Sequence, residues 1–155
     1  MDISIVIPLL NESESILTLH DWIIRSLEKE KNNYEIIFID DGSSDRSWEV
    51  IVELCGRNPN THGIQFSKNY GKSQALHAGF KKAQGDFVVT MDSDGQHPPD
   101  VVAKLLDVAV SRGVEVVYAV RSNRSDDGWA KRLSARAYYR LMRVLTGVPI
   151  ADSAA

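Results

Sequence analysis

The segment V-V-T-M-D-S-D-G-Q-H-P-P-D, residues 88–100, contains one complete transition from strand to helix. The apolar run 87–91 predicts a buried strand, and the two prolines near the end of the segment predict the first turn of a helix. Proline is tolerated there because the first turn leaves its N–H groups without partners. Two carboxylates, Asp92 and Asp94, stand between these elements. A strand, a polar turn and a helix in this order form the repeating unit of parallel α/β folds.

The same unit recurs along the chain. Apolar runs predict strands at residues 3–8, 34–40, 63–66, 87–91 and 114–120. Apolar residues at helical spacing predict helices at residues 13–30, 44–55, 71–83, 98–110 and 129–145. Strands that are apolar throughout are typical of a parallel sheet covered by helices on both faces. The predicted fold class is therefore α/β, an open, doubly wound, mainly parallel sheet, in a single domain over residues 1–155.

Composition places the chain among ordinary globular proteins, with 155 residues, 43% hydrophobic and 25% charged. The single cysteine, Cys55, excludes an internal disulfide and a cysteine-cluster metal site, which fits a reducing compartment. The N-terminus has no signal-peptide pattern, and no apolar run approaches the length of a membrane span. We therefore expect a soluble, cytoplasmic chain. Residues 147–155 cap no evident element, so we also expect the domain to be incomplete at its C-terminus.

The net charge of -3 hides a basic segment near the C-terminus. Between residues 121 and 143 only Asp126 and Asp127 are acidic, whereas seven residues are basic: Arg121, Arg124, Lys131, Arg132, Arg136, Arg140 and Arg143. Such a segment favours an anionic partner, for example a phosphate or a lipid headgroup. The alternative is a solvated helix face.

Polar residues follow every predicted strand, at residues 8–12, 40–44, 67–72, 92–96 and 121–123. Parallel strands bring their carboxyl ends to one edge of the sheet, where such folds bind ligands. Asp92 and Asp94 offer the hard oxygen ligands that suit Mg²⁺ or Mn²⁺. Asp40 and Asp41 could accept hydrogen bonds from a ribose or a base, and Arg121 could bind phosphates. Taken alone, a D-x-D pair is weak evidence, and D-D-G-S-S could be only a turn and a helix cap.

Two common nucleotide motifs are missing from the sequence. No G-x-G-x-x-G follows the first predicted strand, which argues against a Rossmann dinucleotide site. The chain also contains no G-x-x-x-x-G-K-[ST], which argues against a P-loop nucleotide hydrolase. A diphosphate bound through metal, carboxylate and arginine remains the predicted chemistry.

The sequence resembles the family 2 glycosyltransferases, which have a GT-A type fold. Within the family it is most similar to the polyprenyl-phosphate branch, which includes dolichyl-phosphate mannose synthases and bacterial undecaprenyl-phosphate glucosyltransferases. The matching segments follow one another in the family's order and cover essentially the whole chain. They are I-V-I-P-L-L-N-E-S-E-S, I-F-I-D-D-G-S-S-D, F-S-K-N-Y-G-K-S-Q-A-L-H-A-G-F, M-D-S-D-G-Q-H-P-P-D, and V-V-Y-A-V-R followed by W-A-K-R.

The resemblance implies a role for each matching position. The residues expected to bind the nucleotide donor are Pro8, Asn11, Glu12, Asp40, Asp41, Ser67, Lys72 and Asp92. The D-x-D pair Asp92 and Asp94 would bind Mg²⁺ or Mn²⁺, with Gln96 as a further ligand. Asp94, Arg121 and Arg132 are the predicted catalytic residues, with the two arginines on donor or acceptor phosphates.

The resemblance also implies the reaction. It is transfer of a sugar, with inversion, from a nucleotide-diphosphate donor to a polyprenyl phosphate or another cell-envelope glycan acceptor. The form F-S-K-N-Y-G-K is similar to the bacterial branch, which typically uses UDP-sugars. Helix 131–143 would approach the cytoplasmic membrane surface, placing the full-length protein at the inner face of the membrane, and no nucleic-acid partner is implied.

Two departures and two alternatives accompany this interpretation. Gly95 stands where the family more often has leucine or another residue, and the family continues past residue 150 into further strands, helices and often membrane spans. A nucleotide-sugar-binding fragment without turnover is therefore one alternative. The other is a phosphohydrolase of the haloacid-dehalogenase kind, because M-D-S-D-G mimics its nucleophile motif. That motif normally follows the first strand, whereas here it follows the fourth and precedes Gln96.

Overall fold

The computed structural model describes residues 2–29, 33–93 and 100–119. In this part of the chain four strands alternate with four helices, all within residues 1–117, which form one compact unit. The strands are β1 (Asp2–Leu9), β2 (Asn33–Asp40), β3 (Thr61–Gln65) and β4 (Phe87–Thr90). The helices are α1 (Ile16–Lys29), α2 (Ser47–Arg57), α3 (Lys72–Lys82) and α4 (Asp100–Arg112). The predicted alternation of strand and helix is confirmed for these elements.

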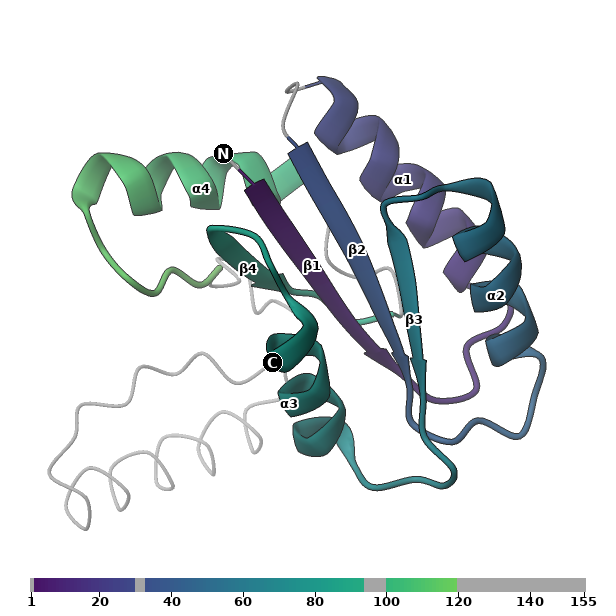
Figure 1. Ribbon diagram of the computed structural model, residues 1–155. Helices are drawn as coiled ribbons and strands as arrows, with labels where there is room; N and C mark the ends of the chain where they lie inside the picture. Colours follow the sequence, from purple (N-terminus) through teal and green to yellow (C-terminus); the bar gives the residue numbers. More distant parts are fainter. Residues whose placement is uncertain (1, 30–32, 94–99, 120–155) are drawn as a thin grey trace, which may run out of the picture. The chain divides into compact units, whose positions relative to one another are not determined.

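The four strands form one parallel sheet in the order β3-β2-β1-β4 (Figure 1). Ile5, in the middle of β1, lies opposite Ile36 of β2 on one side and Val89 of β4 on the other. The chain thus adds β2 and β3 on one side of β1 and then places β4 on the other side. The carboxyl ends of β1 and β4 form the switch point at which sheets of this kind bind ligands.

Helices cover both faces of the sheet (Figure 1). Side chains alternate along β1, so that Ile5 and Ile7 join the core formed with α1, α2 and α4, whereas Val6 joins a smaller core formed with α3. Each fully buried side chain of this size contributes about 1.5–3 kcal/mol. Because β1 is buried on both faces, its sequence is continuously apolar from Ile5 to Leu9. The doubly wound α/β fold is confirmed.

The prediction of a fifth strand at residues 114–120 is wrong for residues 114–119, the part of it that the structure describes. Residues 114–119 follow α4 without pairing to any strand of the described sheet, and 80% of the surface of Val116 is exposed. Strand propensity measures how well side chains fit a half-buried sheet surface, so an apolar run without a neighbouring strand need not form one. Residue 120 and the predicted helix 129–145 lie outside the described residues.

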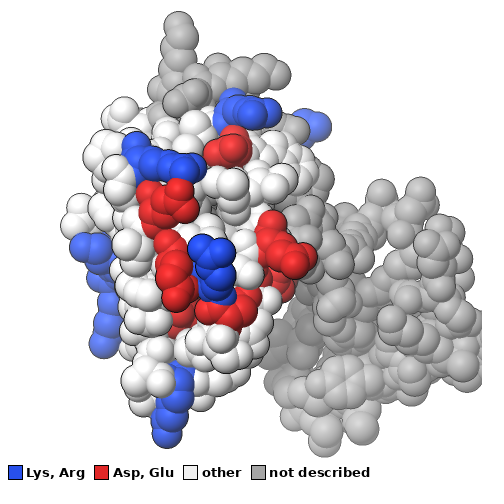
Figure 2. Space-filling view, turned by 90° about the vertical axis from the view of Figure 1, so that its right-hand side faces the viewer, with Lys and Arg blue, Asp and Glu red and all other residues white. Residues whose placement is uncertain are grey.

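The surface over α1 and α2 carries charges of both signs. Figure 2 shows Lys and Arg side chains interspersed with Asp and Glu side chains on this side of the molecule. On α2, Arg57 forms an ion pair with Glu53. Nucleic-acid binding needs a continuous positive surface, which this face does not provide. None of the helices in the described ranges is both long and apolar enough to cross a membrane.

Candidate functional site

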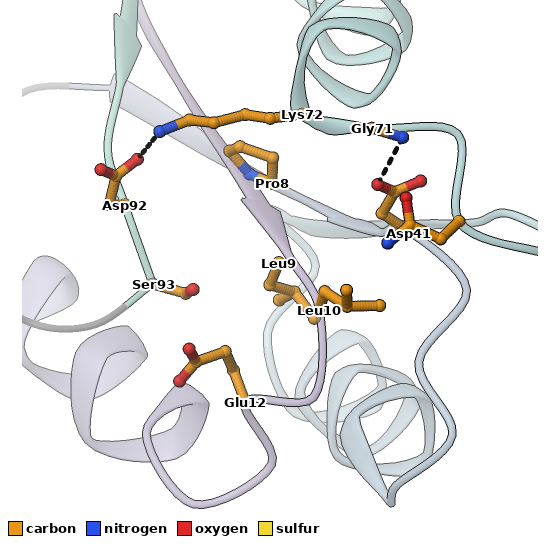
Figure 3. Close-up of a pocket in the computed structure, with 10 residues that line it drawn as sticks. Pro8, Leu9, Leu10, Glu12, Asp41, Gly71, Lys72, Asp92 and Ser93 are labelled. Atoms are coloured by element: carbon orange, nitrogen blue, oxygen red, sulfur yellow. Dashed lines mark hydrogen bonds and ion pairs between the residues drawn. The ribbon is translucent and has the colours of Figure 1, made fainter.

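A cavity of about 310 Å³ lies at the switch point of the sheet (Figure 3). Every loop that follows one of the four described strands contributes to its lining. The residues that line it are Pro8, Leu9, Leu10, Glu12, Asp41, Asn69, Gly71, Lys72, Asp92 and Ser93. Ligand sites are expected at this edge of a parallel sheet, and the polar residues predicted from the sequence supply much of the lining.

An ion pair spans the cavity. The Nζ atom of Lys72 donates a hydrogen bond to Oδ1 of Asp92 at 2.5 Å. In Figure 3 the lysine side chain extends from the start of α3 past Pro8 to Asp92, two residues after the end of β4. The two side chains are 60% and 41% exposed, so a ligand in the cavity could reach both of them.

Asp41 fixes the loop that carries Lys72. Its side chain is buried at 5% exposure and lines the cavity. Oδ1 accepts a hydrogen bond from the backbone N–H of Tyr70 at 2.8 Å, and Oδ2 accepts one from the N–H of Gly71 at 2.9 Å. Asp41 therefore positions the start of α3, because each of its oxygens binds one backbone N–H group of the preceding loop.

Asp40 and Ser67 lie outside this cavity. Asp40 is fully buried, and its Oδ1 accepts a hydrogen bond from the backbone N–H of Ser43 at 2.9 Å. Its Oδ2 accepts one from the amide of Gln65 at 3.4 Å. Ser67 lines a second, open hollow of about 450 Å³ beside the end of β3, together with Gly42, Ser43, Gln65 and Phe66. The two neighbouring aspartates therefore face different surroundings.

Asn11 joins the loop after β1 to the loop after β2. Its φ of 57° is in the left-handed region, which asparagine tolerates better than most residues. The N–H of Asn11 donates to Oγ of Ser43 at 2.8 Å, and Oδ1 of Asn11 accepts from the N–H of Ser44 at 2.8 Å. Asn11 thus holds the two loops together beside the cavity without lining it.

Asp45 extends this connection, and the sequence analysis did not identify it. Its carboxylate accepts hydrogen bonds from the N–H groups of Ser13, at 3.1 Å, and Ser47, at 2.9 Å. Oγ of Ser47 in turn accepts a hydrogen bond from the N–H of Glu12 at 2.9 Å. Burial raises the pKa of Asp45, but the hydrogen bonds from Ser47 and Ser13 outweigh it and lower the pKa to about 2. The ionised carboxylate therefore helps to hold the loop that presents Glu12 to the cavity.

Asp45→Asn is expected to destabilise the fold at neutral pH by about 1 kcal/mol, because an amide replaces a screened, charged acceptor. A lowered pKa means that the ionised form stabilises the fold above the unfolded-state pKa, and that this contribution is lost as the pH falls towards about 2. The difference between the variant and the parent should therefore shrink between about pH 4 and about pH 2. Urea unfolding across this range measures it.

Glu14→Gln is the matched control, since it removes an exposed carboxylate from the loop before α1, next to Ser13. It should change the free energy of unfolding only slightly. A difference between the Asp45 variant and the parent that stays constant with pH would contradict the role of the ionised carboxylate.

The structure brings five of the predicted donor-binding residues to one cavity. They are Pro8, Glu12, Asp41, Lys72 and Asp92. The cavity also includes five residues at or after the same strand ends that were not predicted as site residues: Leu9, Leu10, Asn69, Gly71 and Ser93. The remaining predicted site residues, Asp94, Gln96, Arg121 and Arg132, and the basic helix 131–143 lie outside the described residues.

Asp92 fits one position of a metal site. Its carboxylate is a hard oxygen ligand in a solvent-accessible cavity, which suits Mg²⁺ or Mn²⁺, and Mg²⁺ usually keeps waters and substrate phosphates as its other ligands. Among the residues with described positions, no three His, Cys, Asp or Glu side chains cluster to hold a metal. Asp94 and Gln96 stay predicted as the further ligands.

Comparison with known proteins identifies the family of the chain. The family model described as Glycosyl transferase family 2 matches residues 4–152. The chain belongs to this family. One relative of this family 2 chain is the undecaprenyl-phosphate 4-deoxy-4-formamido-L-arabinose transferase of Pectobacterium atrosepticum, 39% identical over 153 residues. The match covers 97% of the chain and 46% of the relative, so the chain spans about half the length of that protein.

Solved structures support the fold of this family 2 chain. Mannosyl-3-phosphoglycerate synthase from Rubrobacter xylanophilus superposes with a TM-score of 0.72 at 20% identity, over 91% of the chain and 47% of the synthase. A mannosyltransferase from Pyrobaculum calidifontis, in complex with GDP-Man and Mn²⁺, superposes with a TM-score of 0.64 at 21% identity, over 91% of the chain and 38% of the mannosyltransferase. At such identities the likeness establishes the GT-A type fold alone. Family membership leaves no support for the phosphohydrolase alternative.

Proposed function

We propose that the chain forms the donor-binding part of a metal-dependent, inverting glycosyltransferase. The donor would be a nucleotide-diphosphate sugar, and the resemblance to the bacterial branch favours a UDP-sugar. The acceptor would be a polyprenyl phosphate or a cell-envelope glycan. The observation that carries this proposal is the cavity at the switch point, where Glu12, Asp41, Lys72 and Asp92 meet in a family 2 chain. The relative from Pectobacterium, whose name specifies undecaprenyl phosphate, supports this class of acceptor.

The chain's own residues would bind and orient the donor. Pro8 and Leu9 offer apolar surface in the cavity, and Lys72 offers an ammonium group that can bind a phosphate oxygen. A metal ion bound by Asp92, with Asp94 and Gln96, would supply positive charge for the leaving diphosphate. A phosphate acceptor is already anionic, so the reaction needs no general base to activate it.

The remaining predicted residues would act on the phosphates and the membrane. Arg121 and Arg132 are proposed to bind donor or acceptor phosphates, since a guanidinium group matches phosphate geometry. The basic helix 131–143 is proposed to approach the inner face of the cytoplasmic membrane. Each basic residue near an anionic membrane surface contributes about 1 kcal/mol to binding.

A thermal-shift screen tests the donor proposal. The purified chain is heated with UDP, GDP and their sugars, each with and without Mn²⁺, and with ADP as the control nucleotide. We expect UDP with Mn²⁺ to raise the melting temperature most, because a ligand at 100 times its Kd stabilises the fold by about 2.7 kcal/mol. Equal melting temperatures in all mixtures would contradict the proposal. A donor-hydrolysis assay beside the full-length protein separates turnover from binding alone.

A further inference from the structure

Lys72 already neutralises the carboxylate that is proposed to bind the metal. Its Nζ atom lies 2.5 Å from Oδ1 of Asp92, and both side chains line the same cavity. Figure 3 shows the ammonium group beside the carboxylate, with the lysine stem crossing the cavity. Asp92 therefore has a cationic partner that belongs to the chain itself.

The backbone places Lys72 for this contact. Asp41 binds the N–H groups of Tyr70 and Gly71, the two residues that precede Lys72. Anchoring the main chain limits where a flexible lysine side chain can place its ammonium group. The ion pair with Asp92 thus depends on a fixed loop as well as on charge attraction.

From this arrangement we infer that Lys72 opposes binding of a divalent metal ion at Asp92 until a nucleotide diphosphate is present. A metal ion that approaches the carboxylate meets the positive charge of the ammonium group, and like charges repel. A diphosphate removes this obstacle, because its oxygens offer the displaced ammonium group a new anionic partner. Metal and nucleotide should then raise each other's affinity, as linkage between two sites requires. This inference rests on the proposed donor site and adds an order of binding to it.

Titration calorimetry with Mn²⁺ alone tests the inference directly. We expect Lys72→Met to bind Mn²⁺ about tenfold more tightly than the parent, since coupling between neighbouring sites is commonly 5-fold to 150-fold. Lys81→Met is the matched control, because Lys81 lies in the last turn of the same helix and outside the cavity. It should leave Mn²⁺ affinity unchanged. Lys72→Arg, which keeps the charge, should restore weak Mn²⁺ binding.

A second titration adds a saturating concentration of UDP. The parent should gain Mn²⁺ affinity on addition of UDP, and Lys72→Met should gain less, because its carboxylate is already free. Equal Mn²⁺ affinities of Lys72→Met and the parent without nucleotide would overturn the inference, whatever UDP does. Failure of the parent to bind any nucleotide would contradict the proposed function instead, so the two failures are distinguishable. Melting curves of each variant report whether the fold is intact.

Discussion

Asp92→Asn is expected to weaken Mn²⁺-dependent nucleotide-diphosphate binding by about 100-fold, since even the loss of an outer-shell partner of a metal ligand costs about 10–100-fold in metal affinity. The amide removes the negative charge from the end of β4 and leaves one oxygen where two were available. Asp92 lines the cavity, and its Oδ1 already binds a cation, the ammonium group of Lys72 at 2.5 Å. The position is therefore suited to positive charge. Calorimetry with UDP and Mn²⁺ measures the change in Kd.

The same variant should fold normally. Asp92 is 41% exposed, and an exposed ion pair of this kind contributes about 0–1 kcal/mol to stability. Asp107→Asn, which alters an exposed carboxylate on α4, is the control for loss of one negative charge. Unchanged UDP affinity in the Asp92 variant, with the parent dependent on Mn²⁺, would show that the metal binds elsewhere. Asp94→Asn is predicted to have the same effect as Asp92→Asn.

The fold and the position of the site were predictable because both depend on patterns that are local in sequence. Strands such as β1 are apolar on both faces, and this pattern indicates a parallel sheet. A parallel sheet then brings the residues after each strand to one edge. Glu12 and Asp92, 80 positions apart in the sequence, line one cavity for this reason.

The roles of individual polar residues were less predictable, because they depend on contacts between loops. Asp40 and Asp41 are adjacent, yet Asp40 is fully buried beneath the turn while Asp41 lines the cavity. Successive side chains of a strand point to opposite faces of the sheet. The sequence does not specify which of the two faces will contact the loop before α3. Asp45 was missed for the same reason, since its partner Ser13 belongs to another loop. Residues 114–119 show the opposite error, in which local propensity predicted a strand that no neighbouring strand supports within the described part of the chain.

Gly42→Ala is expected to destabilise the fold by about 3 kcal/mol, through backbone strain and steric overlap together. Gly42 has a φ of +76°, which side-chain-bearing residues rarely adopt. A Cβ atom there would lie 2.3 Å from the carbonyl carbon of Lys68 and 2.6 Å from the backbone nitrogen of Asn69. Because these are backbone atoms, relief requires the loop before α3 to move. That loop carries Asn69 and Lys72 into the cavity, so nucleotide affinity should fall with stability.

Variants of two further glycines distinguish the cost of backbone strain from the cost of steric overlap. Gly71 has a φ of 95° and a ψ of 152°, a conformation that residues with a side chain rarely adopt, but open space around a built Cβ, so Gly71→Ala should show strain alone, about 2 kcal/mol. Gly56, within α2, has open space and ordinary helical φ, so Gly56→Ala should stabilise the fold by about 0.5–1 kcal/mol. Urea unfolding of the three variants measures their free energies of unfolding and so ranks their stabilities. If Gly42→Ala lowered the free energy of unfolding no more than Gly71→Ala, the close approach of residue 42 to the loop before α3 would contribute nothing to this loss of stability. The cavity would then not depend on a glycine at residue 42.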